Sequence, residues 1–243
     1  MSHRRRFFVP AGRIKGKKAF LSEDERHHLA DVLRIKEGEE IFLFTEDGVE
    51  YRARILSTKP HHAEAEIVEE IPPRLTDPKV KIYLIIGVLK GKGLELVVRR
   101  GTELGISSFV PVFSARTIVR GLTNVDRLRK IAIEAAKQSG KRTVPDVSLP
   151  VSFSELDLSS FPGLKIILDE KASKRLREVL PNRDEVEEVT VMVGPEGGWS
   201  RDEVREASNY GFIPVGLGER ILRSETAALA ISAIIGYYFG DLG

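Results

Sequence analysis

Hydrophobic positions recur with one rhythm in the first third of this 243-residue chain and with another in the rest. In the first part, short runs bounded by turn signals predict strands at residues 7–9, 40–44, 50–55 and 63–67. One helix interrupts them, because Ser22 and Glu25 have the spacing of a capping box. Leu29, Val32 and Leu33 form its apolar stripe. Strands this short and this close together are typical of a small β-barrel.

A proline-rich stretch separates the two rhythms. Residues 71–78 read Ile-Pro-Pro-Arg-Leu-Thr-Asp-Pro, and prolines at this density disfavour helix and sheet alike. We therefore expect a linker here, between a domain at residues 1–72 and a second domain at residues 76–243.

Beyond the linker, apolar runs alternate with helical patterns. Residues 80–88 are almost continuously apolar, as expected of a strand that is buried on both faces. Further strands are predicted at 108–112, 165–168, 189–193 and 212–215, and helices at 94–104, 125–139, 173–179 and 201–210. This alternation predicts an α/β domain in which helices cover a parallel sheet.

The last helix, from an N-cap at Ser224 to about residue 239, is apolar on nearly every face. A helix that only covers a surface keeps one polar face. We therefore expect this helix to lie in the core and also to form a contact between subunits, which predicts a homodimer.

Two glycine-bearing loops each follow an apolar run and lead into a helix. They are Gly-Pro-Glu-Gly-Gly-Trp-Ser at 194–200 and Leu-Gly-Glu-Arg-Ile-Leu-Arg-Ser-Glu-Thr-Ala at 217–227. In an α/β sheet both would lie at the carboxyl ends of strands, where ligands bind. Glycines let the backbone approach a flat ligand, and Leu217, Ile221 and Leu222 provide apolar walls for an adenine-sized slot. Ordinary turns are also rich in Gly and Pro, but two such loops favour a ligand site.

Composition excludes several classes of function. The absence of cysteine rules out disulfides, thiolate nucleophiles and cysteine-based metal sites. Adjacent histidine pairs at 27–28 and 61–62 lack the i, i+4 spacing of a helical zinc site, so no metal is expected. Residues 87–93 lack the spacing of a nucleotide-binding phosphate loop. With no membrane-length apolar run and no signal-peptide pattern, we expect a cytoplasmic protein without membrane attachment.

Basic residues gather in two runs, although the net charge is only +2. Seven basic residues and no acidic one precede residue 22, and eight basic residues against two acidic ones lie at 114–142. One such run is usually a solvated tail or helix face. Two runs favour a face that binds nucleic acid. The predicted RNA contacts are Arg4, Arg5, Arg6, Arg116, Lys141 and Arg142.

The two loops carry a resemblance to a known family. Residues 194–200 with Glu203, and residues 217–227, resemble the signature loops of the RsmE-type methyltransferases of the SPOUT superfamily. Supporting matches run along most of the chain, at 6–9, His28, 32–34, 102–105, Arg116, 134–139 and Pro145. The chain departs from the family pattern at Lys141, where an arginine is usual. Arg142 stands next to it.

This resemblance implies a fold and an activity. The fold would be an N-terminal PUA-like β-barrel that binds RNA and a C-terminal parallel-sheet α/β SPOUT domain with a trefoil knot. The activity would be methylation of N3 of a specific uridine in 16S ribosomal RNA, with S-adenosyl-L-methionine as the methyl donor. The expected partners are 16S ribosomal RNA or the 30S subunit and a second copy of the chain.

The resemblance also implies site residues. Three loops would hold the cofactor, through Leu168, Gly194, Pro195, Glu196, Gly197, Leu217, Gly218, Ile221, Leu222, Arg223 and Thr226. Uridine N3 must lose its proton, and the charge that then spreads to O2 and O4 needs a nearby cation. Arg223 is the candidate for that cation. Glu225 is the candidate base, with Glu196 as the alternative.

Two other functions compete with this interpretation. Another SPOUT activity, such as ribose 2′-O methylation, would need no acidic proton on a base. A non-catalytic ribosome-assembly factor would keep the fold for RNA binding alone. The intact glycines in both loops argue against the second alternative, because a lost cofactor site has no need of them.

Overall fold

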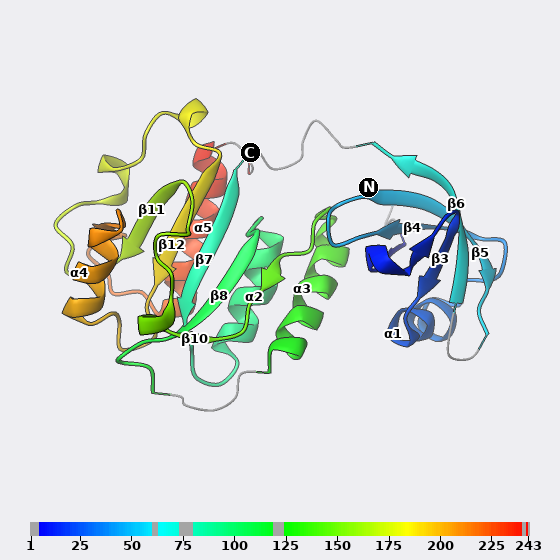
Figure 1. Cartoon of the computed structure of the whole chain (residues 1–243), viewed down its shortest axis with the longest axis horizontal. Coiled ribbons are helices and arrows are strands. Elements are labelled where there is room, and N and C mark those ends of the chain that lie inside the picture. Colours follow the sequence, from blue (N-terminus) through cyan, green and yellow to red (C-terminus); the bar gives the residue numbers. More distant parts are fainter. Residues whose placement is uncertain (1–4, 60–62, 73–79, 119–123, 240–241, 243) are drawn as a thin grey trace. The chain divides into compact units, whose positions relative to one another are not determined.

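The computed structural model describes residues 5–59, 63–72, 80–118, 124–239 and 242 (Figure 1). Contacts divide the chain into two units. The N-terminal unit comprises Met1–Asp77 and also Ala136–Val144, and the C-terminal unit comprises Pro78–Ala135 and Pro145–Gly243. Most of the predicted linker, residues 73–78, lies outside the described residues, so its conformation stays a prediction.

The N-terminal unit is built on one six-stranded sheet. Its order is β1-β4-β5-β6-β3-β2, in which β1 pairs with β4 in parallel and all other neighbours are antiparallel. All four predicted strands are present, whereas β2 and β3 were not predicted. The bounds are β1 Arg6–Phe8, β2 Ile14–Lys15, β3 Lys18–Leu21, β4 Glu40–Phe44, β5 Glu50–Ser57 and β6 Ala63–Ile71, with a short 3₁₀ turn η1 at Ala11–Arg13.

The helix of this unit begins as predicted and then changes type. Ser22 caps α1 (Glu23–His27), because its Oγ accepts the N–H of Glu25 at 3.3 Å. A π-helical turn, η2 (His28–Val32), follows, in which each bond spans one extra residue. This extra residue rotates the stripe, so Leu29 is buried in the core while Val32 and Leu33 are exposed, and the predicted stripe is wrong at those two positions.

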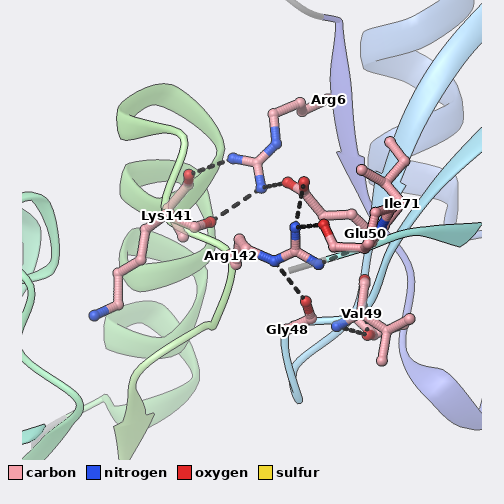
Figure 2. A network of polar contacts seen from close by, with 10 residues as sticks. Arg6, Gly48, Val49, Glu50, Ile71, Lys141 and Arg142 are labelled. Atoms are coloured by element: carbon pink, nitrogen blue, oxygen red, sulfur yellow. Dashed lines mark hydrogen bonds and ion pairs between the residues drawn. The ribbon is translucent and has the colours of Figure 1, made fainter. Parts of the chain in front are cut away.

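A buried cluster of charges holds the segment 136–144 to this sheet (Figure 2). Glu50 on β5 binds Arg6 on β1 at 2.5 Å and Arg142 at 3.3 Å. The three side chains are 5%, 3% and 8% exposed for Arg6, Glu50 and Arg142. Arg6 also donates to the carbonyl oxygens of Ala136 and Lys141, both at 3.0 Å.

Arg142 completes the cluster from the other side. Its guanidinium donates to the carbonyl oxygens of Gly48, Ile71 and Pro72 at 3.0–3.2 Å, so it binds the β4–β5 turn and the end of β6 at once. Figure 2 shows the side chain of Lys141 pointing away from the two guanidinium groups. The segment is therefore part of the fold of the N-terminal unit, although it is encoded between elements of the other unit.

The C-terminal unit contains a seven-stranded parallel sheet, which confirms the predicted α/β class. The order is β10-β8-β7-β12-β11-β13, and β9 pairs with β8. The trefoil knot implied by the resemblance stays a prediction. The strands are β7 Lys81–Gly87, β8 Ser108–Phe113, β9 Asp146–Val147, β10 Val151–Ser152, β11 Leu164–Leu168, β12 Glu188–Val193 and β13 Ile213–Val215.

Helices pack on this sheet through the apolar positions seen in the sequence. Val204 and Ala207 of α4 pack in one core cluster with strand residues such as Ile85. α2 and α5 contact each other, and α5, red in Figure 1, lies behind β7 and β12. The bounds are α2 Gly93–Glu103, α3 Val125–Ser139, α4 Arg201–Asn209 and α5 Ser224–Phe239, with 3₁₀ turns η3 Phe153–Glu155 and η5 Arg183–Glu185.

Two local predictions in this unit are wrong. The helix expected at 173–179 is only a 3₁₀ turn, η4 (Leu176–Glu178). The chain just before this turn is held by Gly216, whose N–H donates to the carbonyl oxygen of Lys174 at 2.9 Å. Ser224 is not the N-cap but already helical, because the Ala227 N–H donates to the carbonyl oxygen of Arg223.

Candidate functional site

Three neighbouring strands end together at one edge of the parallel sheet. β12, β11 and β13 lie side by side, and the register pairs Leu168, the last residue of β11, with Val215, the last residue of β13. Because the strands are parallel, the loops that follow them converge. They line a cavity of about 830 Å³, within the range of about 300–1,000 Å³ that is usual for small-molecule sites.

The loop after β12 is closely packed at its start, where an added side chain would not fit. A Cβ on Gly87, at the end of β7, would lie 2.4 Å from Pro195, so only glycine fits there. A Cβ on Gly194 would lie 3.0 Å from the backbone of Gly198 and Trp199. Gly198 itself has a φ of +66°, which glycine adopts without strain. The loop thus presents its backbone to the cavity.

The buried carboxylate of Glu203 holds this loop by hydrogen bonds. Glu203 on α4 accepts the N–H of Ser200 and the N–H of Ala115, both at 2.7 Å, while the Glu203 N–H donates to Ser200 Oγ at 3.1 Å. This confirms the predicted capping box and ties it to the turn after β8. The same turn carries Arg116, whose Nη1 donates to the carbonyl oxygen of Gly197 at 3.1 Å.

The loop after β13 supplies the apolar and cationic side of the cavity. Gly218 has a φ of +131°, a conformation that other residues rarely adopt. Arg223 is exposed at the cavity, and within the residues that the structure describes no carboxylate binds its side chain. Leu217, Ile221, Leu222 and Glu225 also line the cavity.

Most predicted cofactor residues therefore lie on one cavity. Leu168, Gly194, Pro195, Glu196, Leu217, Gly218, Ile221, Leu222 and Arg223 all line it. Gly197 and Thr226 are not among the lining residues: Gly197 backs onto the side chain of Arg116, and Thr226 is exposed on the first turn of α5. Their contacts with a cofactor stay predictions.

Glu196, the alternative base, has a local partner. Its Oε1 accepts the N–H of Lys90 at 2.8 Å, which ties the loop after β12 to the loop after β7. Lys90, Gly93, Asp169, Trp199 and Gly216 line the cavity and were not predicted as site residues. The rule that ligands bind at carboxyl ends of strands, applied also to β7, would have indicated Lys90.

The predicted RNA contacts are spread over different environments. Arg4 lies outside the described residues, and Arg5 is exposed and pairs with Glu39 at 3.2 Å. Arg6 and Arg142 are buried around Glu50, an arrangement that gives both a role inside the fold. Their contact with RNA, like that of Lys141, stays a prediction. Arg116 lies on the cavity wall.

The described part of the chain offers neither a cluster of metal ligands nor a membrane-spanning helix. No group of three or more His, Asp or Glu side chains there is arranged to hold a metal ion. None of the helices in those residues is long and apolar enough to cross a membrane.

Comparison with known families supports both parts of the fold. The pattern of the RNA methyltransferase domain matches residues 76–236, and that of the RNA methyltransferase PUA domain matches residues 21–68. The PUA assignment made from the sequence is thereby confirmed.

Individual relatives match along nearly the whole chain. Ribosomal RNA small subunit methyltransferase E of Bacillus subtilis is 31% identical over 226 residues, which are 88% of each protein. The protein of the same name from Aquifex aeolicus is 32% identical and covers 91% of this chain and 95% of its own. A crystal structure of ribosomal RNA small subunit methyltransferase E from Neisseria gonorrhoeae bound to S-adenosyl methionine has a TM-score of 0.87 at 34% identity, covering 99% of this chain and 100% of its own.

Proposed function

Because this chain belongs to the family of ribosomal RNA small subunit methyltransferase E, we propose that it methylates small-subunit ribosomal RNA with S-adenosyl-L-methionine. The target we propose is N3 of a uridine in 16S ribosomal RNA. The observation that carries this proposal is the cavity at the ends of β12, β11 and β13, which the predicted cofactor residues line. The family relationship extends over 88% of the chain or more in the relatives described above.

The residues present fit this cofactor. The backbone of Gly194, Gly216 and Gly218 lies open to the cavity for the polar edge of an adenine, and Leu217 and Leu222 offer apolar walls. Asp169, which directly follows β11, lines the cavity, and its carboxylate would accept hydrogen bonds from hydroxyl groups of the cofactor. When bound, the cofactor supplies a methyl group on a sulfonium centre, which is an electrophile.

The protein must then handle one proton and one developing negative charge. N3 of uridine loses its proton to the base, and the negative charge that results spreads to O2 and O4. N3 then takes the methyl group as the bond from the methyl carbon to the sulfonium sulfur breaks, which neutralises the uracil and leaves a neutral thioether. Arg223 is the cation we assign to that charge, because it faces the cavity and has no carboxylate partner within the described residues. Glu225 is the base we assign, since Glu196 already accepts the Lys90 N–H.

We also propose the partners. The apolar helix α5 leaves Ile234 and Tyr237 exposed, at 41% and 65%, one turn apart. Such a stripe supports the predicted homodimer, because burying it would remove apolar area from water. A substrate of ribosomal RNA or an assembling 30S subunit would place the protein in the cytoplasm.

The test combines binding with product analysis. Calorimetry should give a 1:1 complex of the wild-type protein with S-adenosyl-L-methionine per chain. Small-subunit ribosomal RNA incubated with both should then yield 3-methyluridine after digestion to nucleosides and mass spectrometry. A 2′-O-methylated nucleoside would support the ribose alternative, and cofactor binding without any RNA product would support the assembly-factor alternative. Failure to bind the cofactor would overturn the proposal.

A further inference from the structure

A hairpin at the edge of the N-terminal sheet carries a cluster of exposed basic side chains. The hairpin runs from the turn η1 through β2 to the start of β3, residues 13–18, and reads Arg-Ile-Lys-Gly-Lys-Lys. Arg13, Lys15 and Lys17 are exposed, and within the described part of the chain their side chains have no hydrogen bond or ion pair. β2 is the last strand of the sheet, next to β3, which is dark blue in Figure 1.

Several other basic side chains of the same unit are paired with carboxylates. Arg5 pairs with Glu39, Arg26 with Asp31, and Arg54 with Glu40. The more deeply placed Arg6, Lys137 and Arg142 are bound by Glu50 or Glu25. Against this background, Arg13, Lys15 and Lys17 stand out because three exposed cations without a carboxylate partner in the described residues lie within five consecutive positions.

The hairpin also opposes like charges. The register places Lys15 directly across from Lys18 in the antiparallel pair, an arrangement that destabilises a hairpin. Of these two lysines, Lys18 has a counter-charge among the described residues, Glu64 at 3.4 Å. A lysine on an edge strand can prevent pairing with another sheet. That role would need Lys15 alone, because Arg13 and Lys17 lie outside β2.

We propose that the hairpin at residues 13–18 binds the phosphate backbone of the substrate RNA. The inference rests on the proposed function, and it moves the RNA-binding face from the predicted Arg4–Arg6 to this hairpin. RNA phosphates would supply the negative charge that the described residues around Arg13, Lys15 and Lys17 lack. They would also screen the repulsion between Lys15 and Lys18. Phosphate contacts of this kind position RNA without reading its sequence.

A charge-matched pair of variants tests the inference on the full-length protein. Lys15→Gln/Lys17→Gln removes two charges from the hairpin. Lys36→Gln/Lys59→Gln removes two exposed lysines of the same unit that lie outside the hairpin. Binding to a transcript of 16S ribosomal RNA is measured between about 50 and 200 mM salt. Two lost phosphate contacts should lower the slope of log affinity against log salt by about 1.4–1.8, with roughly tenfold or greater weakening near 0.1 M.

The hairpin inference predicts that only the first variant changes the salt slope, and that Lys15→Arg/Lys17→Arg keeps the wild-type slope. The melting temperature of the hairpin variant should stay the same or rise, since it removes a repulsion, and its affinity for S-adenosyl-L-methionine should be unchanged. Equal slopes for both glutamine variants would overturn the inference while leaving the methyltransferase proposal intact. A wild-type protein that neither binds nor methylates the RNA would overturn both.

Discussion

Replacing Glu50 by Gln should destabilise the N-terminal unit more than any exposed charge change. The carboxylate compensates two guanidinium groups whose side chains are 5% and 8% exposed. Removing one partner of a buried ion pair typically costs about 3–5 kcal/mol, because the remaining charge stays buried. The variant keeps the hydrogen bonds that the two guanidinium groups donate to backbone carbonyl oxygens, so we expect a cost at the lower end, near ~3 kcal/mol. Those carbonyls belong to Ala136, Lys141, Gly48, Ile71 and Pro72.

The measurement must report on the N-terminal unit separately. The only tryptophan, Trp199, lies in the C-terminal unit, so its fluorescence follows the unfolding of that unit. Amide hydrogen exchange of β1, β5 and the segment 136–144 follows the other. A loss of about 3 kcal/mol corresponds to exchange roughly 100-fold faster at the most protected amides of the N-terminal unit.

The control is Glu69→Gln, which removes an exposed carboxylate from the same sheet. Glu69 pairs with Arg52, and their side chains are 55% and 33% exposed. Such pairs contribute about 0–1 kcal/mol, so exchange should change less than about fivefold. If Glu50→Gln and Glu69→Gln behaved alike, the cluster in Figure 2 would not hold the segment 136–144, and the reasoning would be refuted.

Further predictions concern the cavity and acid stability. Gly197→Val should abolish calorimetric binding of S-adenosyl-L-methionine, because a Cβ at position 197 would lie 3.1 Å from the Cβ of Arg116. Gly218→Val should also abolish binding, because valine does not adopt the φ of +131° at this position without strain. An affinity within twofold of wild type would contradict the assigned pocket. Arg223→Lys should lower the single-turnover rate of methylation at saturating cofactor by about 10²–10³. Hydrogen bonds from Arg52 hold the pKa of Glu69 below its ordinary 4.5, so this pair contributes stability above that pH and loses it as the pH falls; Glu69→Gln should therefore flatten the decline in melting temperature between about pH 5 and pH 3.

The sequence predicted best where a local pattern has one structural solution. The capping box of Ser200 and Glu203 and the cap at Ser22 were found because their spacing directly fixes hydrogen bonds to the backbone. The parallel sheet followed from the alternation of apolar runs with helical patterns. The cavity followed in turn, because parallel strands must end at the same edge.

Failures came where contacts distant in sequence decide the local structure. Nothing near Val32 reveals the π-helical turn that exposes it. The segment before η4 is not helical, and the carbonyl oxygen of Lys174 accepts the N–H of Gly216, which lies about 40 residues further along the chain. The hairpin of β2 and β3 did have a local signal, since Gly16 and Lys17 form a two-residue connection in which Gly16 has a φ of +60°.

The charge pattern did not reveal which basic side chains are buried. Arg6 and Arg142 belong to two basic runs that favour nucleic acid, yet both are buried on one glutamate. A run counts charges without their partners, and Glu50 is far from both arginines in sequence. Exposed cations that have no partner within the described residues, such as Arg13 and Lys17, are visible only once the fold is known.

The segment 136–144 limits how this protein can change in evolution. Nine residues that complete the N-terminal unit lie in the sequence between two segments of the C-terminal unit. Recombination at the proline-rich linker would therefore transfer an N-terminal unit without Arg142, one of the two arginines that bind Glu50. The two halves must be inherited together, and a substitution in one has to be accepted by the other.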